Sequence, residues 1–120
     1  MKKLIFVFLL PGLILLVGCG QKNTSTNAVS IKEPIFFYST DCGHCQKVKQ
    51  YIADHKIEEK VTFSLVEAFT TEANYNLFND KAAGCRLSES QKGVPLIYEN
   101  GKCYIGEIEA IDFFKKKAGL

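Results

Sequence analysis

Apolar runs of two kinds mark the first strands of the chain beyond residue 33. The continuous apolar run Ile35–Tyr38 follows Pro34 and has no alternation, which is typical of a strand buried on both faces. Further on, Val61, Phe63 and Leu65 alternate with their neighbours in the manner of a second strand. The pattern therefore predicts two strands separated by about 25 residues, enough for a helix between them.

Three segments have the spacing and end signals of helices. Apolar residues three and four positions apart predict the first, while threonine caps, a glycine stop and charged ends that match the helix dipole predict the others. The predicted helices are Gly43–His55, the segment from Thr70 and Thr71 through about Ala82 with its stop at Gly84, and the segment from Glu107 to Lys117 with Ile108, Ile111 and Phe114 on one face. Ser88, with Gln91 three residues later, predicts a further short helical turn.

A hairpin is expected between the second and third helices. Asn100-Gly101 is the strongest two-residue hairpin signal, and it joins strands predicted at Pro95–Glu99 and Lys102–Ile105. The order β-α-β-α-β-β-α makes one α/β domain, a four-stranded mixed sheet flanked by helices. A chain of 120 residues has room for one such core and no second domain.

The first 18 residues differ from the rest. Lys2 and Lys3 precede Leu4–Val17, fourteen residues without a charged or polar side chain, as in a secretory signal. A membrane-spanning helix needs roughly 20 residues. The stretch ends in Leu16-Val17-Gly18-Cys19, which resembles a bacterial lipobox, so we expect cleavage before Cys19 and acylation of its side chain, palmitate included. The alternatives are a secretory signal with an unmodified Cys19, or an uncleaved short anchor.

These features divide the chain into a lipoprotein signal peptide (1–18), a lipidated N-terminus with a flexible tether (19–32) and a folded domain (33–120). Gln21–Ser30 is polar and without periodicity, as flexible tethers are. We expect an extracytoplasmic monomer, lipid-anchored to the cell membrane or the outer membrane. The two leader lysines account for the net charge of +2, so the remainder offers no electrostatic argument for binding nucleic acid.

Five cysteines are the other unusual feature, and two of them carry the candidate chemistry. Cys42 lies where the first helix begins, and free N–H groups and the helix dipole at that end favour a thiolate. Cys45 follows one turn later, close enough to resolve a mixed disulfide. His44, between them, can place a positive charge near Cys42, which stabilises the reduced thiolate and makes the disulfide more oxidising.

Residues Glu33–Ala118 resemble a compact thioredoxin-like domain of the thioredoxin and glutaredoxin kind. Cys42-Gly43-His44-Cys45 is similar to the site of protein disulfide isomerases, and Gly93-Val94-Pro95 looks like the loop that faces the active-site disulfide in this fold. The resemblance implies a three-layer sandwich, a cis bond before Pro95, and pairing of the Val94 backbone with the substrate.

Several positions depart from the family pattern. Asp41 stands before the first cysteine in place of a tryptophan, and Phe36 stands where many relatives carry a buried acid that moves protons for the second thiol. Glu67, at the end of the second predicted strand, is an alternative candidate for that proton transfer, or else a solvated strand-end residue. Asp41 opposes thiolate formation at Cys42 while His44 favours it, so the sequence leaves the reduction potential open.

Cys85 and Cys103 remain. In an oxidising compartment we expect them to form a structural disulfide. Two unpaired thiols and a second redox pair are the alternatives. A four-ligand zinc site built from these cysteines or His44 is a further alternative, but the Cys42–Cys45 pair opening a helix suits redox chemistry better, so we expect no metal.

The expected function is that of a membrane-tethered extracytoplasmic thiol–disulfide oxidoreductase that acts on proteins and needs no cofactor. Cys42 attacks or is attacked, Cys45 resolves, His44 tunes the potential, and Val94 and Pro95 present the client chain. The expected partners are cysteine-containing client proteins and an upstream redox partner. The alternatives are a thiol reductase in cytochrome maturation or repair, and a redox-inactive or metal-handling binding module on the same scaffold.

Overall fold

The computed structural model describes residues 30–120. The expected signal peptide, the lipidation site at Cys19 and most of the tether lie outside the described residues. The helices and strands are β1 (Ile35–Tyr38), α1 (Gly43–Asp54), the 3-10 helix η1 (Ile57–Glu59), β2 (Ser64–Glu67), α2 (Glu72–Gly84), β3 (Leu96–Glu99), β4 (Lys102–Ile105) and α3 (Gly106–Lys117). Apart from the added η1, this is the predicted order. No helix within residues 30–120 is both long and apolar enough to cross a bilayer.

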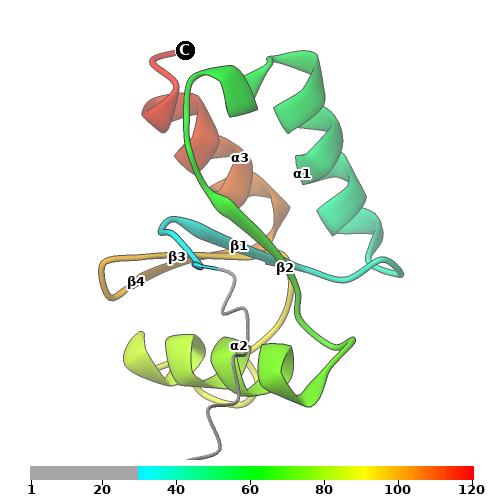
Figure 1. The fold of residues 1–120 in the computed structure, drawn as a ribbon, viewed down its shortest axis with the longest axis vertical. Helices are drawn as coiled ribbons and strands as arrows, with labels where there is room; N and C mark the ends of the chain where they lie inside the picture. The colour runs from blue at the N-terminus through cyan, green and yellow to red at the C-terminus, as the bar shows by residue number, and fades with distance from the viewer. Residues whose placement is uncertain (1–29) are drawn as a thin grey trace, which may run out of the picture.

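The four strands form one mixed sheet in the order β2-β1-β3-β4. β1 runs parallel to β2 and antiparallel to β3, and β3 pairs with β4 as the predicted hairpin. Helices α1 and α3 cover one face of the sheet and α2 covers the other (Figure 1). The predicted α/β architecture, a thioredoxin-like sandwich around a four-stranded mixed sheet, is therefore confirmed.

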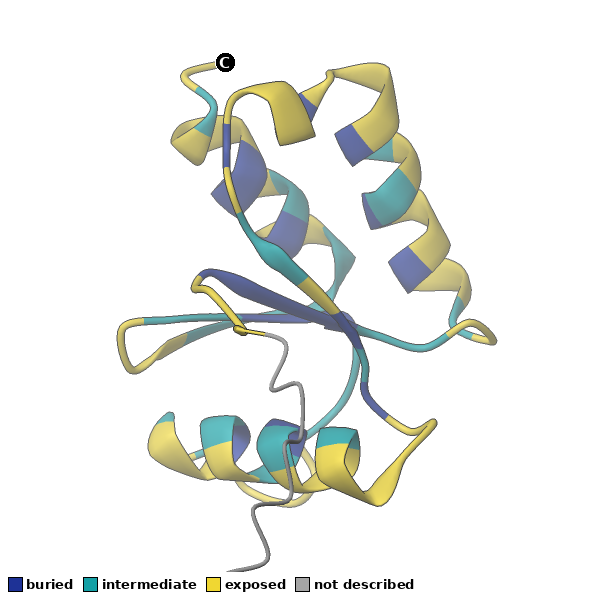
Figure 2. Cartoon of the chain, viewed as in Figure 1, coloured by how far each residue is buried: buried dark blue, intermediate teal, exposed yellow. Residues whose placement is uncertain are grey.

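Strand β1 explains why the core has two halves. Successive side chains of a strand point to opposite faces, so Phe36 packs toward α1 and α3 while Ile35 and Phe37 pack toward α2. All three side chains are almost fully buried, and most of β1 is coloured as buried in Figure 2. The lack of alternation in β1 thus follows from its central place between two helical layers.

The second strand differs from the prediction. It begins at Ser64 rather than at Val61, and Leu65 is 44% exposed while Val66 is buried. Val61 is buried because the chain leaving η1 turns inward there, where the Val61 N–H donates to the Ile57 carbonyl at 2.8 Å. The predicted strand therefore includes an irregular segment before Ser64, and only its second half is the short edge strand β2.

The buried face of α3 also differs from the prediction. Ile108 is 77% exposed, and the buried residues are Ala110, Phe113 and Phe114. Phe114 lies at the centre of the packing against α1, with its ring edge-on to that of Phe36. Two adjacent phenylalanines set the rotation of the helix, and this rotation leaves Ile108 at the surface.

The predicted short turn at Ser88 is present. The N–H groups of Gln91 and Lys92 donate to the Ser88 carbonyl at 2.9 and 3.1 Å, and the Ser88 N–H donates to the Gln91 side chain at 3.0 Å. The predicted end of the second helix needs a small correction. Gly84 does not follow the second helix but is its last residue, and Cys85 is the C-cap.

Cys85 and Cys103 are disulfide-bonded in the structure, with Cα atoms 5.9 Å apart. The bond links the C-terminal end of α2 to β4. The two cysteines are 18 positions apart in the sequence, and the segment between them contains Val94 and Pro95. The disulfide therefore restrains both ends of the segment that carries the loop toward the first cysteine pair.

We expect the double substitution Cys85→Ala, Cys103→Ala to lower the free energy of unfolding by about 3 kcal/mol, because opening a loop of this length restores conformational entropy to the unfolded chain. Urea titration of the oxidised proteins measures the difference. A variant as stable as the wild type would show that the disulfide contributes nothing to the fold.

Candidate functional site

The Cys42–Cys45 pair lies where β1 has ended and α1 begins. Cys42 is the N-cap of α1 with extended backbone angles, and its sulfur accepts a hydrogen bond from the Cys45 N–H at 3.1 Å. The two residues are disulfide-bonded, with Cα atoms 5.2 Å apart. An N-cap acceptor receives N–H groups that have no partner within the helix, so a thiolate at this sulfur is stabilised by the same contact.

The two sulfurs differ in access to solvent. Cys45 is fully buried against the α1 side of the core, while Cys42 is partly exposed. A nucleophile from another protein can reach the disulfide at Cys42 and not at Cys45. The roles of attacked and resolving cysteine therefore have a geometric basis.

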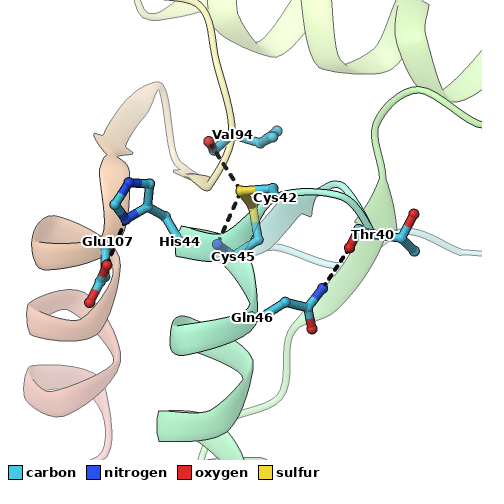
Figure 3. Close-up of a disulfide and its surroundings, with 7 residues drawn as sticks. All are labelled: Thr40, Cys42, His44, Cys45, Gln46, Val94 and Glu107. Carbon is cyan, nitrogen blue, oxygen red and sulfur yellow. Dashed lines mark hydrogen bonds and ion pairs between the residues drawn. A yellow bond between two sulfur atoms is a disulfide. The ribbon is translucent and has the colours of Figure 1, made fainter.

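The loop before β3 faces Cys42 across a long stretch of sequence. The carbonyl oxygen of Val94 lies 3.6 Å from the Cys42 sulfur, and the Val94–Pro95 bond is cis (Figure 3). Pro95 is buried, and its carbonyl accepts a hydrogen bond from the Gly106 N–H at 2.9 Å. The fold thus brings Val94 beside the cysteine pair and ties the loop to the start of α3.

His44 binds a residue that the sequence did not single out for the site. Its Nδ1 lies 2.7 Å from Oε2 of Glu107, and the Nζ of Lys47 lies 3.5 Å from the same oxygen. The hydrogen bond from His44 lowers the pKa of Glu107, the nearby charge of Lys47 lowers it further, and partial burial of the carboxylate opposes both effects. The sequence indicates Glu107 only as a helix-start residue, because nothing local relates it to a histidine 63 positions earlier.

An open hollow of about 360 Å³ lies beside the disulfide. Its lining comes from the three segments already described, namely His44, Val94, Pro95, Ile105, Gly106, Glu107 and Ile108. The exposed Ile108 therefore borders the site. A second hollow of similar volume is lined by Glu99, Tyr104 and one side of α3, and its lining includes neither His44 nor the Val94 loop.

The other residues that the sequence analysis singled out form no hydrogen bond with either sulfur among the described residues. Phe36 is a buried apolar residue, so its position offers no carboxylate for proton transfer. Glu67 ends β2 opposite Tyr38, and its Oε2 is buried without a hydrogen-bond partner, but no hydrogen bond among the described residues connects it to Cys45. Its role in proton transfer stays a prediction. Asp41 is exposed in the turn before α1.

Among residues 30–120, no group of three or more His, Cys, Asp or Glu side chains is arranged to hold a metal ion. No protein-family model matches the chain, and no curated protein is similar enough to match it. The fold and the geometry of the Cys42–Cys45 pair together support a redox role.

We expect Cys42 to react with iodoacetamide much faster than Cys45 in the reduced protein at pH 6–7, because only Cys42 combines exposure with the N-terminus of a helix. Mass spectrometry of peptides after short labelling times measures the two rates. Equal rates, or faster labelling of Cys45, would reverse the assignment of roles.

Proposed function

We propose that the protein is a thiol–disulfide oxidoreductase that exchanges disulfides with client proteins through Cys42 and Cys45. The observation that carries the proposal is the asymmetry of the pair. One sulfur is partly exposed at the N-terminus of α1 beside the Val94 carbonyl, and the other is buried one turn inside. Structural disulfides do not need one accessible sulfur held at a helix N-terminus, whereas exchange does.

In the oxidising direction, a client thiolate attacks the Cys42 sulfur and the Cys42–Cys45 bond breaks. The electron pair of that bond goes to Cys45, which leaves as a thiolate and takes up a proton, and the client is joined to Cys42 as a mixed disulfide. A second client thiolate then attacks the client sulfur of this bond. Cys42 leaves as a thiolate that the helix N-terminus and the Cys45 N–H stabilise, so the client is oxidised and the pair is reduced.

In the reducing direction the same steps run in reverse. The Cys42 thiolate attacks a client disulfide, and Cys45 then attacks the Cys42 sulfur and releases the reduced client. One observation favours this direction as the second candidate. His44, whose charge would make the pair more oxidising, is bound by the carboxylate of Glu107.

The Val94 loop supports binding of a client as an extended segment. A carbonyl beside the attacked sulfur offers a main-chain acceptor to a client strand, which is how exposed backbone recognises extended peptides. The hollow next to it provides room for the client side chains that flank the cysteine. In this proposal Val94 and Pro95 bind the client, and no organic cofactor or metal takes part.

The proposal includes a lipid anchor on Cys19 and an extracytoplasmic location. Its support is the leader, with two lysines, an apolar stretch and Leu16-Val17-Gly18-Cys19. Several acyl chains on one residue would hold the domain at a membrane surface, since each buried methylene contributes about 0.8 kcal/mol. The polar residues after Cys19 would then keep the domain clear of the lipid headgroups.

We expect the wild-type protein to accelerate the refolding of a reduced disulfide protein or the reduction of insulin, and Cys42→Ser to abolish both. Cys45→Ser should accumulate a mixed disulfide between Cys42 and the client, because the resolving thiol is missing. Non-reducing electrophoresis with peptide mapping identifies the bond.

The variant Cys85→Ala, Cys103→Ala is the matched control, since it keeps the first pair intact. It should form the same adduct in the Cys45→Ser background at a temperature where it is folded. Absence of any client adduct, or an adduct through Cys85 or Cys103, would refute the proposed function.

For the anchor, we expect Cys19→Ser to abolish incorporation of a labelled fatty acid and to release the protein from membranes or leave it unprocessed. Cys85→Ala, Cys103→Ala tests whether acylation depends on the second cysteine pair and should be labelled normally. Membrane retention and normal processing of Cys19→Ser would show that no lipid is attached there.

A further inference from the structure

We propose that Glu107 is a positioning residue that restrains His44 and offsets its charge, so that the Cys42–Cys45 pair is less oxidising than its Cys-Gly-His-Cys sequence alone predicts. This inference rests on the proposed redox function and concerns the regulation of the same site. It assigns a role to a residue of the last helix that lies 63 positions from His44 in the sequence.

The first support is the geometry of the contact. His44 is the second residue of α1, Glu107 is the second residue of α3, and their side chains meet at 2.7 Å where the two helices begin side by side. Figure 3 shows the His44 ring directed toward Glu107, while the Cys42 sulfur is directed toward Val94. The contact therefore holds the imidazole on the α3 side of the site.

The second support is that Glu107 is itself held in place. The Gly106 N–H donates to the Pro95 carbonyl at 2.9 Å, and the Ile105 N–H donates to the carboxylate of Glu109 at 2.7 Å. The first bond ties the start of α3 to the loop that faces Cys42, and the second holds the first turn of α3 to its own N-cap residue. A carboxylate on that turn has a fixed place beside the cysteine pair, unlike a carboxylate on a free loop.

The third support is the charge balance. The hydrogen bond from His44 lowers the pKa of Glu107, and an anion at the N-terminus of α3 is favoured by the helix dipole, so Glu107 stays negative wherever His44 is positive. Lys47, on the same side of α1, shares this carboxylate, and Asp41 adds a negative charge in the turn before α1. When His44 is paired in this way, its charge stabilises a thiolate at Cys42 less strongly.

Removal of the Glu107 charge should therefore free His44 to interact with the thiolate. Glu107→Gln keeps the size of the side chain and its capacity for hydrogen bonding. Exposed ion pairs contribute little because solvent screens them, so we expect only about a two- to fivefold shift of the exchange equilibrium with glutathione toward the reduced pair. For a two-electron couple this fold-change converts to about 9–21 mV in the oxidising direction.

A double-mutant cycle separates restraint of His44 from a direct effect of Glu107 on the sulfur. We would measure the equilibrium constant with glutathione at pH 6 for wild type, Glu107→Gln, His44→Ala and the double variant. The shift caused by Glu107→Gln should fall to less than half in the His44→Ala background. Asp112→Asn, the same charge change at an exposed position of α3, is the control and should leave the constant unchanged.

An equal shift in both backgrounds would mean that Glu107 acts on Cys42 without His44, and no shift or a shift toward the oxidised pair would also overturn the inference. These outcomes are separable from failure of the proposed function. Normal turnover of clients with an unchanged equilibrium constant counts against this inference alone. A shifted constant without turnover of any client counts against the proposed function alone.

Discussion

The N-terminus of α1 is the constraint on which the site depends. Cys42 is the N-cap, so its sulfur accepts the Cys45 N–H and lies in the positive field of the helix dipole. The same turn places Cys45 on the inward face, where it is fully buried. One local feature thus makes Cys42 accessible and stabilises its thiolate, while Cys45 can react only with the adjacent Cys42 sulfur.

The sheet places the Val94 loop opposite the N-terminus of α1. Because β1 is central and buried on both faces, the turn that leads to Cys42 leaves the sheet at a fixed point, and β3, its antiparallel neighbour, begins immediately after Pro95. The Val94 carbonyl therefore faces the Cys42 sulfur. The bond from the Gly106 N–H to the Pro95 carbonyl extends this arrangement to α3. The loop therefore contacts α1 through the Cys42 sulfur and α3 through main-chain atoms.

The sequence predicted the parts of this arrangement that depend on local signals. The unbroken apolar run of β1, the Cys42 position before α1 and the Asn100-Gly101 hairpin each carry their own physical reason within a few residues. The predictions that Leu65 of β2 and Ile108 of α3 are buried were wrong. An apolar side chain on an edge strand or at a helix start can lie on the buried or the exposed face, and the packing of distant residues decides which. The contact between His44 and Glu107 had no local signal at all, since it exists only once two distant helices begin side by side.

We propose that Cys42 and Cys45 form an exchangeable couple rather than a structural bond. The most direct measurement is the reduction potential of this pair in the wild-type domain, determined by equilibration with glutathione or dithiothreitol buffers. We expect a value in the range of known catalytic pairs, from about −120 to about −270 mV. A value below about −300 mV, as structural disulfides in secreted proteins have, would contradict it.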